Sequence, residues 1–309
     1  MKKITLFLMT ISLYSLNLFS QANWDGDGTQ GNFSWTENWY GNSNPTSGSG
    51  VDLIFNYKNG SQTQLYFDWG WTNFRSIIYA NTFPNALDFN GSGNGINYYW
   101  KVENISSHKQ TINIPLSFKG SGSELNPLNG DLEFTQVIYN DVNKPFVSYF
   151  GTSPKSLILS NYIVGNNSVT LTLKNSNYGF VKINCNMPSL STGSFSGGVK
   201  IERGELWFNA DAAINGGTIY VGNGDSNTAK LYINDSNGGT TVSNTINIPV
   251  NSTNSVIGGL NSSNVNTFSG NVELNSYVLL ENVSAGGTTN FSGVISGSYN
   301  VNINGAGIV

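Results

Sequence analysis

A short strand-and-turn unit recurs along this chain, and it limits the folds that the chain can adopt. The tripeptide Phe-Ser-Gly occurs at residues 195–197, 268–270 and 291–293, and each copy is followed within two residues by a valine. A related unit, Leu-Asn-Gly-Asp-Leu-Glu-Phe, occupies residues 128–134. Recurrence of one small unit is typical of stacked repeat architectures, in which each unit contacts only its neighbours.

The stretch 193–208 shows the unit most fully. It predicts one short strand containing Val199 and Ile201, a turn at Arg203-Gly204, and a second short strand containing Leu206 and Phe208. Apolar residues at alternate positions place one face of each strand in a core. The residues that we expect in the core of the stack are Phe195, Val199, Ile201, Leu206, Phe208, Phe268 and Phe291.

A longer recurrence joins two distant segments. Thr-Ile-Asn-Ile-Pro at residues 111–115 returns at residues 245–249, which lie 134 positions later. Each copy precedes a polar segment and then a unit of the Leu/Phe-x-Gly kind. The pattern predicts one long cycle followed by the start of another.

The residue types indicate an all-β fold. Glycine alone contributes 36 residues, and Asn, Ser and Thr dominate the polar positions, which disfavours helices. Short alternating runs of strand-forming residues are separated by turns rich in Asn and Gly. Two closures would bury the apolar faces: a right-handed parallel β-helix, or β-sandwich modules as the alternative. Strands of about five residues with Asn or Gly at nearly every corner favour the β-helix.

The N-terminus has the pattern of an export signal. Lys2-Lys3 is a positive region, residues 4–19 are mostly apolar, and Ser20-Gln21-Ala22 is a plausible cleavage site. Residues 1–22 are therefore predicted to be a signal peptide, and we expect the mature chain to be exported with no membrane span. Residues 23–104 then form an aromatic-rich β region, and residues 105–309 a β-helical repeat region that we expect to be truncated at the C-terminus.

The aromatic-rich region supports two interpretations. Its tryptophans can be a cap that covers the open end of the stack, or a platform on which carbohydrate stacks. The carbohydrate-stacking candidates are Trp24, Trp35, Trp39, Trp69, Trp71 and Trp100.

Charge and ligand-forming residues exclude several classes of function. The formal net charge is −4 with only two arginines, so a nucleic-acid partner has no basic surface to bind. One cysteine and one histidine, Cys185 and His108, cannot form a Cys/His metal cluster. The acidic sequences Asp25-Gly26-Asp27-Gly28 and Gly222-Asn223-Gly224-Asp225 lack the remainder of a calcium loop. We therefore predict no metal and no cofactor.

The chain resembles passenger and adhesin proteins that carry autotransporter-associated β-strand repeats. The resemblance rests on residues 195–206, 216–222, 229–233, 239–244 and 291–297, with Trp24-Asp25-Gly26, Asn38-Trp39 and residues 51–55 near the N-terminus. It implies a secreted, right-handed parallel β-helix that is displayed on or released from a bacterial surface, where it serves as a stalk or adhesive scaffold. Such a passenger would be followed by a membrane barrel or a sorting domain, neither of which is recognisable here, so we expect the chain to be a fragment of a longer protein.

The acidic residues are the basis of the alternative interpretation, in which the chain is an enzyme. Asp131 and Glu133 are two positions apart on a predicted strand, about 7 Å from each other, which is a spacing used by inverting glycosidases. Alternation with Leu132 and Phe134 also fits a solvated strand face, and the same holds for Glu202 and Glu205 beside their turn. We therefore expect a non-catalytic scaffold whose partners are glycans or a host cell or matrix surface. The alternative is a polysaccharide-binding protein, or a polysaccharide hydrolase or lyase.

Overall fold

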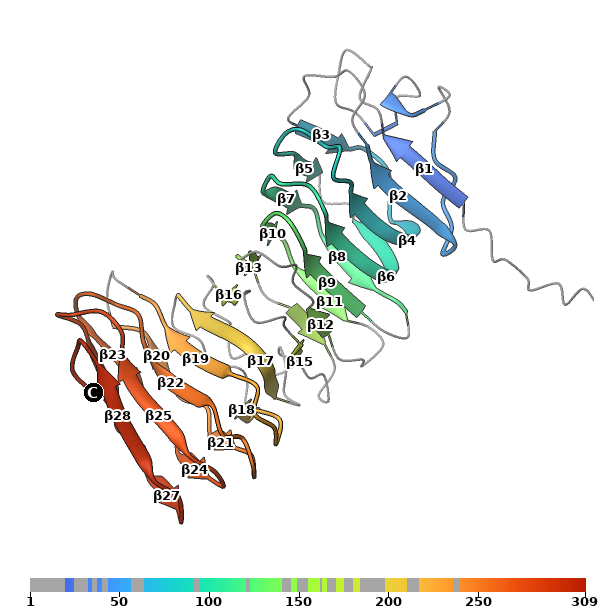
Figure 1. Cartoon of the computed structure of the whole chain (residues 1–309). Coiled ribbons are helices and arrows are strands. Elements are labelled where there is room, and N and C mark those ends of the chain that lie inside the picture. The colour runs from blue at the N-terminus through green and yellow to red at the C-terminus, as the bar shows by residue number, and fades with distance from the viewer. Residues whose placement is uncertain are drawn as a thin grey trace, which may run out of the picture.

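The described part of the chain consists of parallel strands stacked in successive coils, which confirms the predicted all-β parallel β-helix (Figure 1). The computed structural model describes residues 20–24, 33–34, 38–40, 44–56, 64–91, 95–120, 123–140, 146–148, 155–161, 163–165, 171–174, 180–183, 198–209, 217–235 and 239–309. Every ladder between named strands in these ranges is parallel, and none of these residues belongs to an α-helix. Parallel connections of this kind coil in the right-handed sense.

Two long sheets run along the stack. Sheet A contains β1 (Ser20–Trp24), β2 (Val51–Phe55), β4 (Thr72–Tyr79), β6 (Ile96–Asn104), β8 (Leu116–Phe118), β9 (Ser123–Pro127), β11 (Ile138–Asn140), β12 (Phe146–Ser148), β14 (Ile163–Gly165), β15 (Leu171–Lys174), β18 (Ile219–Val221), β21 (Ile246–Ile248), β24 (Val272–Leu274) and β27 (Ile295–Gly297). Sheet B contains β3 (Gln64–Phe67), β5 (Asp88–Gly91), β7 (Gln110–Asn113), β10 (Leu132–Phe134), β13 (Ser156–Leu159), β16 (Phe180–Ile183), β19 (Ala229–Ile233), β22 (Ser255–Gly259), β25 (Val278–Asn282) and β28 (Val301–Gly305). A third, short sheet in the last coils contains β20 (Thr241–Val242), β23 (Val265–Phe268) and β26 (Thr288–Phe291). Sheet A divides at β6, whose first part pairs with β8 and whose second part pairs with β9, so it covers two faces of the coils that follow.

The true repeat is one coil, and it is much shorter than the cycle of 134 residues predicted from the sequence. Paired residues on sheet B are between 22 and 26 positions apart, as in Phe134 with Ile112 and Gly259 with Ile233. The two Thr-Ile-Asn-Ile-Pro segments do not occupy equivalent places, because Ile112 lies on sheet B and Ile246 on sheet A. The long-cycle prediction is therefore wrong: a similar alternation of apolar residues suits either face.

The stretch 193–208 also differs from its prediction. Residues Val199–Phe208 form one continuous strand, β17, which bends between two faces instead of turning back. Its first part pairs with β15 and β18 on sheet A, and its second part pairs with β16 and β19 on sheet B. The bend coincides with a register shift opposite Leu173 and Lys174, and with Gly204 at φ 92°. Glycine tolerates that backbone conformation, so the sequence signal for a turn marks a corner of the coil.

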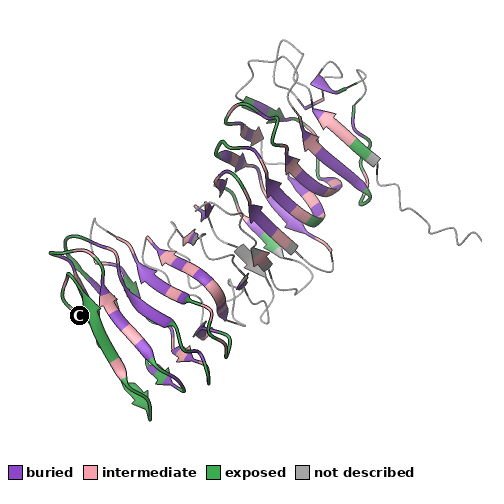
Figure 2. Ribbon diagram, in the orientation of Figure 1, coloured by how far each residue is buried: buried purple, intermediate pink, exposed green. Residues whose placement is uncertain are grey.

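The core fills the space between the faces (Figure 2). Of the predicted core residues, Val199, Ile201, Leu206, Phe208 and Phe268 are fully buried. Phe291 is partly buried and stacks on Phe268 with ring centroids 5.2 Å apart. Phe195 lies outside the described residues.

The Phe-Ser-Gly unit is explained by the close approach of neighbouring coils. Phe268 and Phe291 are paired residues on β23 and β26. A Cβ atom added to Gly270 would lie 2.0 Å from the carbonyl oxygen of Asn244, and one added to Gly293 would lie 2.1 Å from the oxygen of Gly270. Only glycine lets the backbone of one coil pass so near the next at this corner.

An aromatic cluster closes the first coils. Trp24 in β1 and Trp39 form an isolated antiparallel bridge, and their rings meet edge to face with centroids 5.1 Å apart. Phe33 lies beneath them, 4.8 Å from the Trp39 ring, and its carbonyl oxygen accepts a hydrogen bond of 2.8 Å from Trp39 Nε1. All three side chains are buried, so this cluster covers the core at the β1 end of the stack.

Candidate functional site

Two exposed aromatic side chains meet on the outer side of sheet A. Trp71 immediately precedes β4, and Tyr139 lies in β11. Their ring centroids are 6.2 Å apart with an interplanar angle of 68°, although 48% of Trp71 and 36% of Tyr139 remain exposed. The pair is therefore an aromatic surface open to solvent. We call Trp71 and Tyr139 the aromatic pair.

The backbone beneath Trp71 makes room for the indole. Gly95 lies one coil further along, and a Cβ atom there would come within 2.7 Å of the Trp71 ring. The ring therefore lies directly over the backbone at Gly95. Any larger residue at that position would push the indole away from the sheet.

A row of uncharged polar side chains lies beside the aromatic pair. Asn73, Asn97, Ser117 and Tyr139 are successive partners in the ladder from β4 through β6 and β8 to β11. The Asn97 amide Nδ2 donates a hydrogen bond of 2.9 Å to Asn73 Oδ1. Amide ladders of this kind tie neighbouring coils together and leave polar groups at the surface. The aromatic pair with Asn73 and Asn97 is named the sheet A site.

Trp100 belongs to a separate cluster with a balanced charge. The Arg75 guanidinium lies 4.9 Å from the centroid of the Trp100 ring, and Lys101 Nζ lies 4.8 Å from it. Arg75 is paired with Asp52, to which its Nε donates a hydrogen bond of 2.7 Å, and Lys101 is paired with Glu103. The two cations thus hold Trp100 while their own charges are neutralised by neighbouring carboxylates.

The other predicted stacking residues are placed differently. Trp24 and Trp39 are only 2% and 1% exposed, so they cannot stack on a sugar, and their interpretation as part of a carbohydrate platform is wrong. Trp69 is partly buried and contacts the core, with its ring 4.9 Å from that of Phe33. Trp35 lies outside the described residues. Sequence reasoning missed Tyr139, because alternation predicts an outward residue there but cannot place it beside Trp71.

The two acids with glycosidase spacing are engaged in contacts with other segments of the stack. Asp131 Oδ1 accepts a hydrogen bond of 2.7 Å from the backbone N–H of Ser156, in the next coil. Glu133 is paired with Lys109 and accepts a hydrogen bond of 2.7 Å from Ser160 Oγ. Burial acts to raise the pKa of Glu133, but the hydrogen bonds and the Lys109 charge outweigh it and lower that pKa. A carboxyl with a lowered pKa is a poor proton donor at neutral pH.

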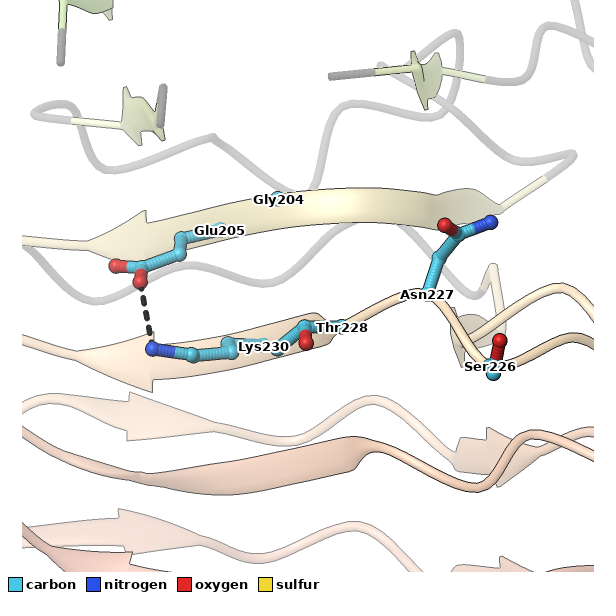
Figure 3. Close-up of a pocket in the computed structure, with 6 residues that line it drawn as sticks. All are labelled: Gly204, Glu205, Ser226, Asn227, Thr228 and Lys230. Carbon is cyan, nitrogen blue, oxygen red and sulfur yellow. Dashed lines mark ion pairs between the residues drawn. The ribbon is translucent and has the colours of Figure 1, made fainter. Parts of the chain in front are cut away.

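A hollow of about 350 Å³ lies where β17 passes from sheet A to sheet B. Figure 3 shows Glu205 and Lys230 projecting from adjacent strands, while Asn227 and Ser226 come from the loop before β19. Glu205 Oε1 lies 2.9 Å from Lys230 Nζ, and Glu205 Oε2 accepts a hydrogen bond of 2.8 Å from Trp207 Nε1. Both oxygens of this carboxylate are therefore occupied by protein groups. Glu202 likewise lies 3.3 Å from Lys200.

Another polar contact lies on the outer side of sheet B. Tyr232 donates a hydrogen bond of 2.5 Å to Glu281 across the intervening Gly258. Burial, followed by the hydrogen bond to Glu281 and its charge, raises the pKa of Tyr232 above its ordinary value. A Cβ atom on Gly258 would lie 1.9 Å from the carbonyl oxygen of Glu281, so this position has to be glycine.

Residues suited to metal binding do not come together in the described ranges, where no group of three or more His, Cys, Asp or Glu side chains could hold an ion. Asp225 instead accepts hydrogen bonds from the backbone and side-chain amide of Asn227. His108 is exposed. Residues 25–28 and Cys185 lie outside the described residues.

The described ranges also contain no helix that is long and apolar enough to cross a membrane. Residues 1–19 of the predicted signal peptide lie outside those ranges. Ser20, Gln21 and Ala22 of the predicted cleavage site are part of β1, where they pair with Val51–Leu53 of β2.

Comparison with known proteins gives no relative. No protein-family model, no curated protein sequence and no solved structure matches the chain.

Proposed function

We propose that this chain is an exported, non-catalytic scaffold of the adhesin kind, which acts at or outside a bacterial cell surface. The observation that supports this most directly is the uninterrupted stack of coils with polar ladders on its outer side. Asn23 with Asn56, Asn73 with Asn97, and Asn90 with Asn113 join neighbouring coils through side-chain hydrogen bonds of 2.9, 2.9 and 2.7 Å. Such a stack is long and stiff because each coil is held by the next.

Export is supported by the positive and apolar N-terminal segments, and the adhesin role by the sequence resemblance to autotransporter-associated β-strand repeat proteins. The alternative of polysaccharide degradation would need Asp131 and Glu133, whose carboxylates are engaged in structural contacts. The alternative of polysaccharide binding has a specific observation in its favour, namely the sheet A site.

Cell fractionation tests the proposal. The protein should be found in the medium or on the surface of intact cells, where added protease removes it, and its N-terminus should begin near Asn23. A deletion strain should attach less well to a surface than its parent, and a copy of the gene should restore attachment. Retention of uncleaved protein in the cytoplasm, or attachment unchanged by the deletion, would contradict the proposal.

A further inference from the structure

We propose that the sheet A site binds a neutral polysaccharide, with Trp71 and Tyr139 stacking on the sugar rings and Asn73 and Asn97 bonding their hydroxyl groups. This inference rests on the proposed display outside the cell and names the ligand class of that surface. Exposed aromatic side chains are common in carbohydrate-binding surfaces, where their rings contact the apolar face of a sugar, and here they lie beside uncharged amide groups. Here two of them, from β4 and β11, come together with ring centroids 6.2 Å apart.

The site is already formed without a ligand. The Trp71 ring lies over Gly95 and is inclined by 68° to the Tyr139 ring, and both residues belong to or adjoin strands of a continuous sheet. Side chains that are held in place before binding lose little conformational freedom when a ligand arrives. The stiffness of the stack therefore favours stacking interactions that a flexible loop would weaken.

Hydrogen-bonding groups lie next to this apolar surface. Asn97 Nδ2 donates to Asn73 Oδ1, which leaves the Asn73 Nδ2 donor and the Asn97 Oδ1 acceptor directed to other partners. Both asparagines are half-buried and so remain accessible from solvent. An amide donor and an amide acceptor beside aromatic rings can bond vicinal hydroxyl groups while the rings contact the apolar face of a sugar.

Charge selects a neutral ligand over an acidic one. The row Asn73, Asn97, Ser117 and Tyr139 carries no charge, and the whole chain has a formal net charge of −4. The cations near Trp100 are paired with Asp52 and Glu103. An acidic polysaccharide would therefore meet no uncompensated positive charge among these groups and would be repelled by the protein as a whole.

The shape of the site selects a polymer. Three strand spacings separate β4 from β11, which places the two ends of the row about 14 Å apart on an open sheet face. A single sugar on such a flat surface would gain too few contacts to offset the cost of binding. A chain lying along the stack can contact the aromatic pair and the amides together.

Affinity electrophoresis in gels that contain hydroxyethyl cellulose, xyloglucan, galactomannan or laminarin tests this inference, with polygalacturonate as the acidic control. At least one neutral polymer should retard the wild-type protein, and polygalacturonate should not. Trp71→Ala and Tyr139→Ala should each weaken binding about tenfold or more in titration calorimetry with the retarding polymer. Unfolding temperatures should fall only modestly, because neither side chain belongs to the buried core and 48% of Trp71 and 36% of Tyr139 are exposed.

A matched control lies in the last coils. Tyr277 and Tyr299 form another exposed edge-to-face pair, with centroids 6.0 Å apart and exposures of 49% and 43%. Tyr277→Ala should bind as wild type does. The inference is overturned if no neutral polymer binds, if the Trp71 and Tyr139 variants bind normally, or if Tyr277→Ala abolishes binding. A protein displayed outside the cell that binds no polymer would overturn this inference alone, whereas one that binds polymer but is retained inside would overturn only the proposed function.

Discussion

Ile201 offers the sharpest test of how the stack is held together. The side chain is fully buried on β17, and its register partners are Leu173 on β15 and Val221 on β18, which are buried as well. Replacing it with alanine removes three carbons from a core position between two coils. Substitutions of this kind cost about 2–5 kcal/mol, which corresponds to a fall in unfolding temperature of roughly 4–10 °C or more for a chain of this size.

Ile201→Asp should be worse, and its cost should depend on pH. Burying an unpaired carboxylate costs several kcal/mol, so the pKa of the new side chain would lie above its unfolded value of about 3.9. With a folded pKa above the unfolded value, the variant should come closest to wild type below about pH 4 and lose stability as pH rises. Thermal and urea unfolding at about pH 4 and pH 7 measure this difference.

Hydrogen exchange should localise the damage to β17 and its neighbours β15 and β18, because each coil contacts only the next. Lys200→Ala is the matched control, since Lys200 is adjacent but points outward, with 39% of its side chain exposed. That change should alter stability by less than about 0.5 kcal/mol. Equal unfolding of Ile201→Asp and Lys200→Ala would show that the strand faces the other way and would refute the reasoning.

Three further outcomes follow from the structure. Trp39→Ala should lower the free energy of unfolding by about 3–5 kcal/mol, because the buried indole covers the core. The first coils should then become the earliest site of protease cleavage, and cleavage at the wild-type rate would contradict this. Glu133 has a lowered folded pKa, so its contribution to stability should be present above its unfolded pKa of about 4.3 and disappear as pH falls. Glu133→Gln should therefore reduce the free energy of unfolding more at pH 7 than at low pH. An equal loss at both pH values would count against this prediction. Burial is the main reason that the pKa values of Tyr79 and Tyr232 are raised, so their contribution to stability should be lost as pH rises above about 10. Ultraviolet titration should therefore show fewer ionising tyrosines in the folded than in the unfolded protein. Identical titration curves would refute this prediction.

The strand pattern could be predicted because it depends on local alternation. Short runs of strand-forming residues, such as 64–67, 180–183 and 229–233, form β3, β16 and β19 in the structure. Alternation also indicated an inward side for residues such as Ile201 and Leu206, since successive side chains on a strand point to opposite faces. Glycine and asparagine between the runs marked the corners.

The register between coils could not be read in the same way. Ile112 and Ile246 lie in identical pentapeptides but on different sheets, because strands on every face alternate inward apolar and outward polar residues in the same way. The bend at Arg203-Gly204 was predicted as a turn, yet the chain continues in one strand onto the next face. Backbone pairing with the coils on either side decides between these outcomes, and that information is not local.

The candidate site, too, could be predicted only in part from the sequence. The sequence by itself determined an all-β chain with a one-sided apolar pattern, for which a parallel β-helix is the favoured closure, and it singled out the aromatic residues near the N-terminus. Only the tertiary structure decided that Trp39 is buried in the closing cluster while Trp71 is exposed beside Tyr139. The reason is that the coil period sets which distant residues become neighbours, and this period depends on the backbone pairing of each coil with the next.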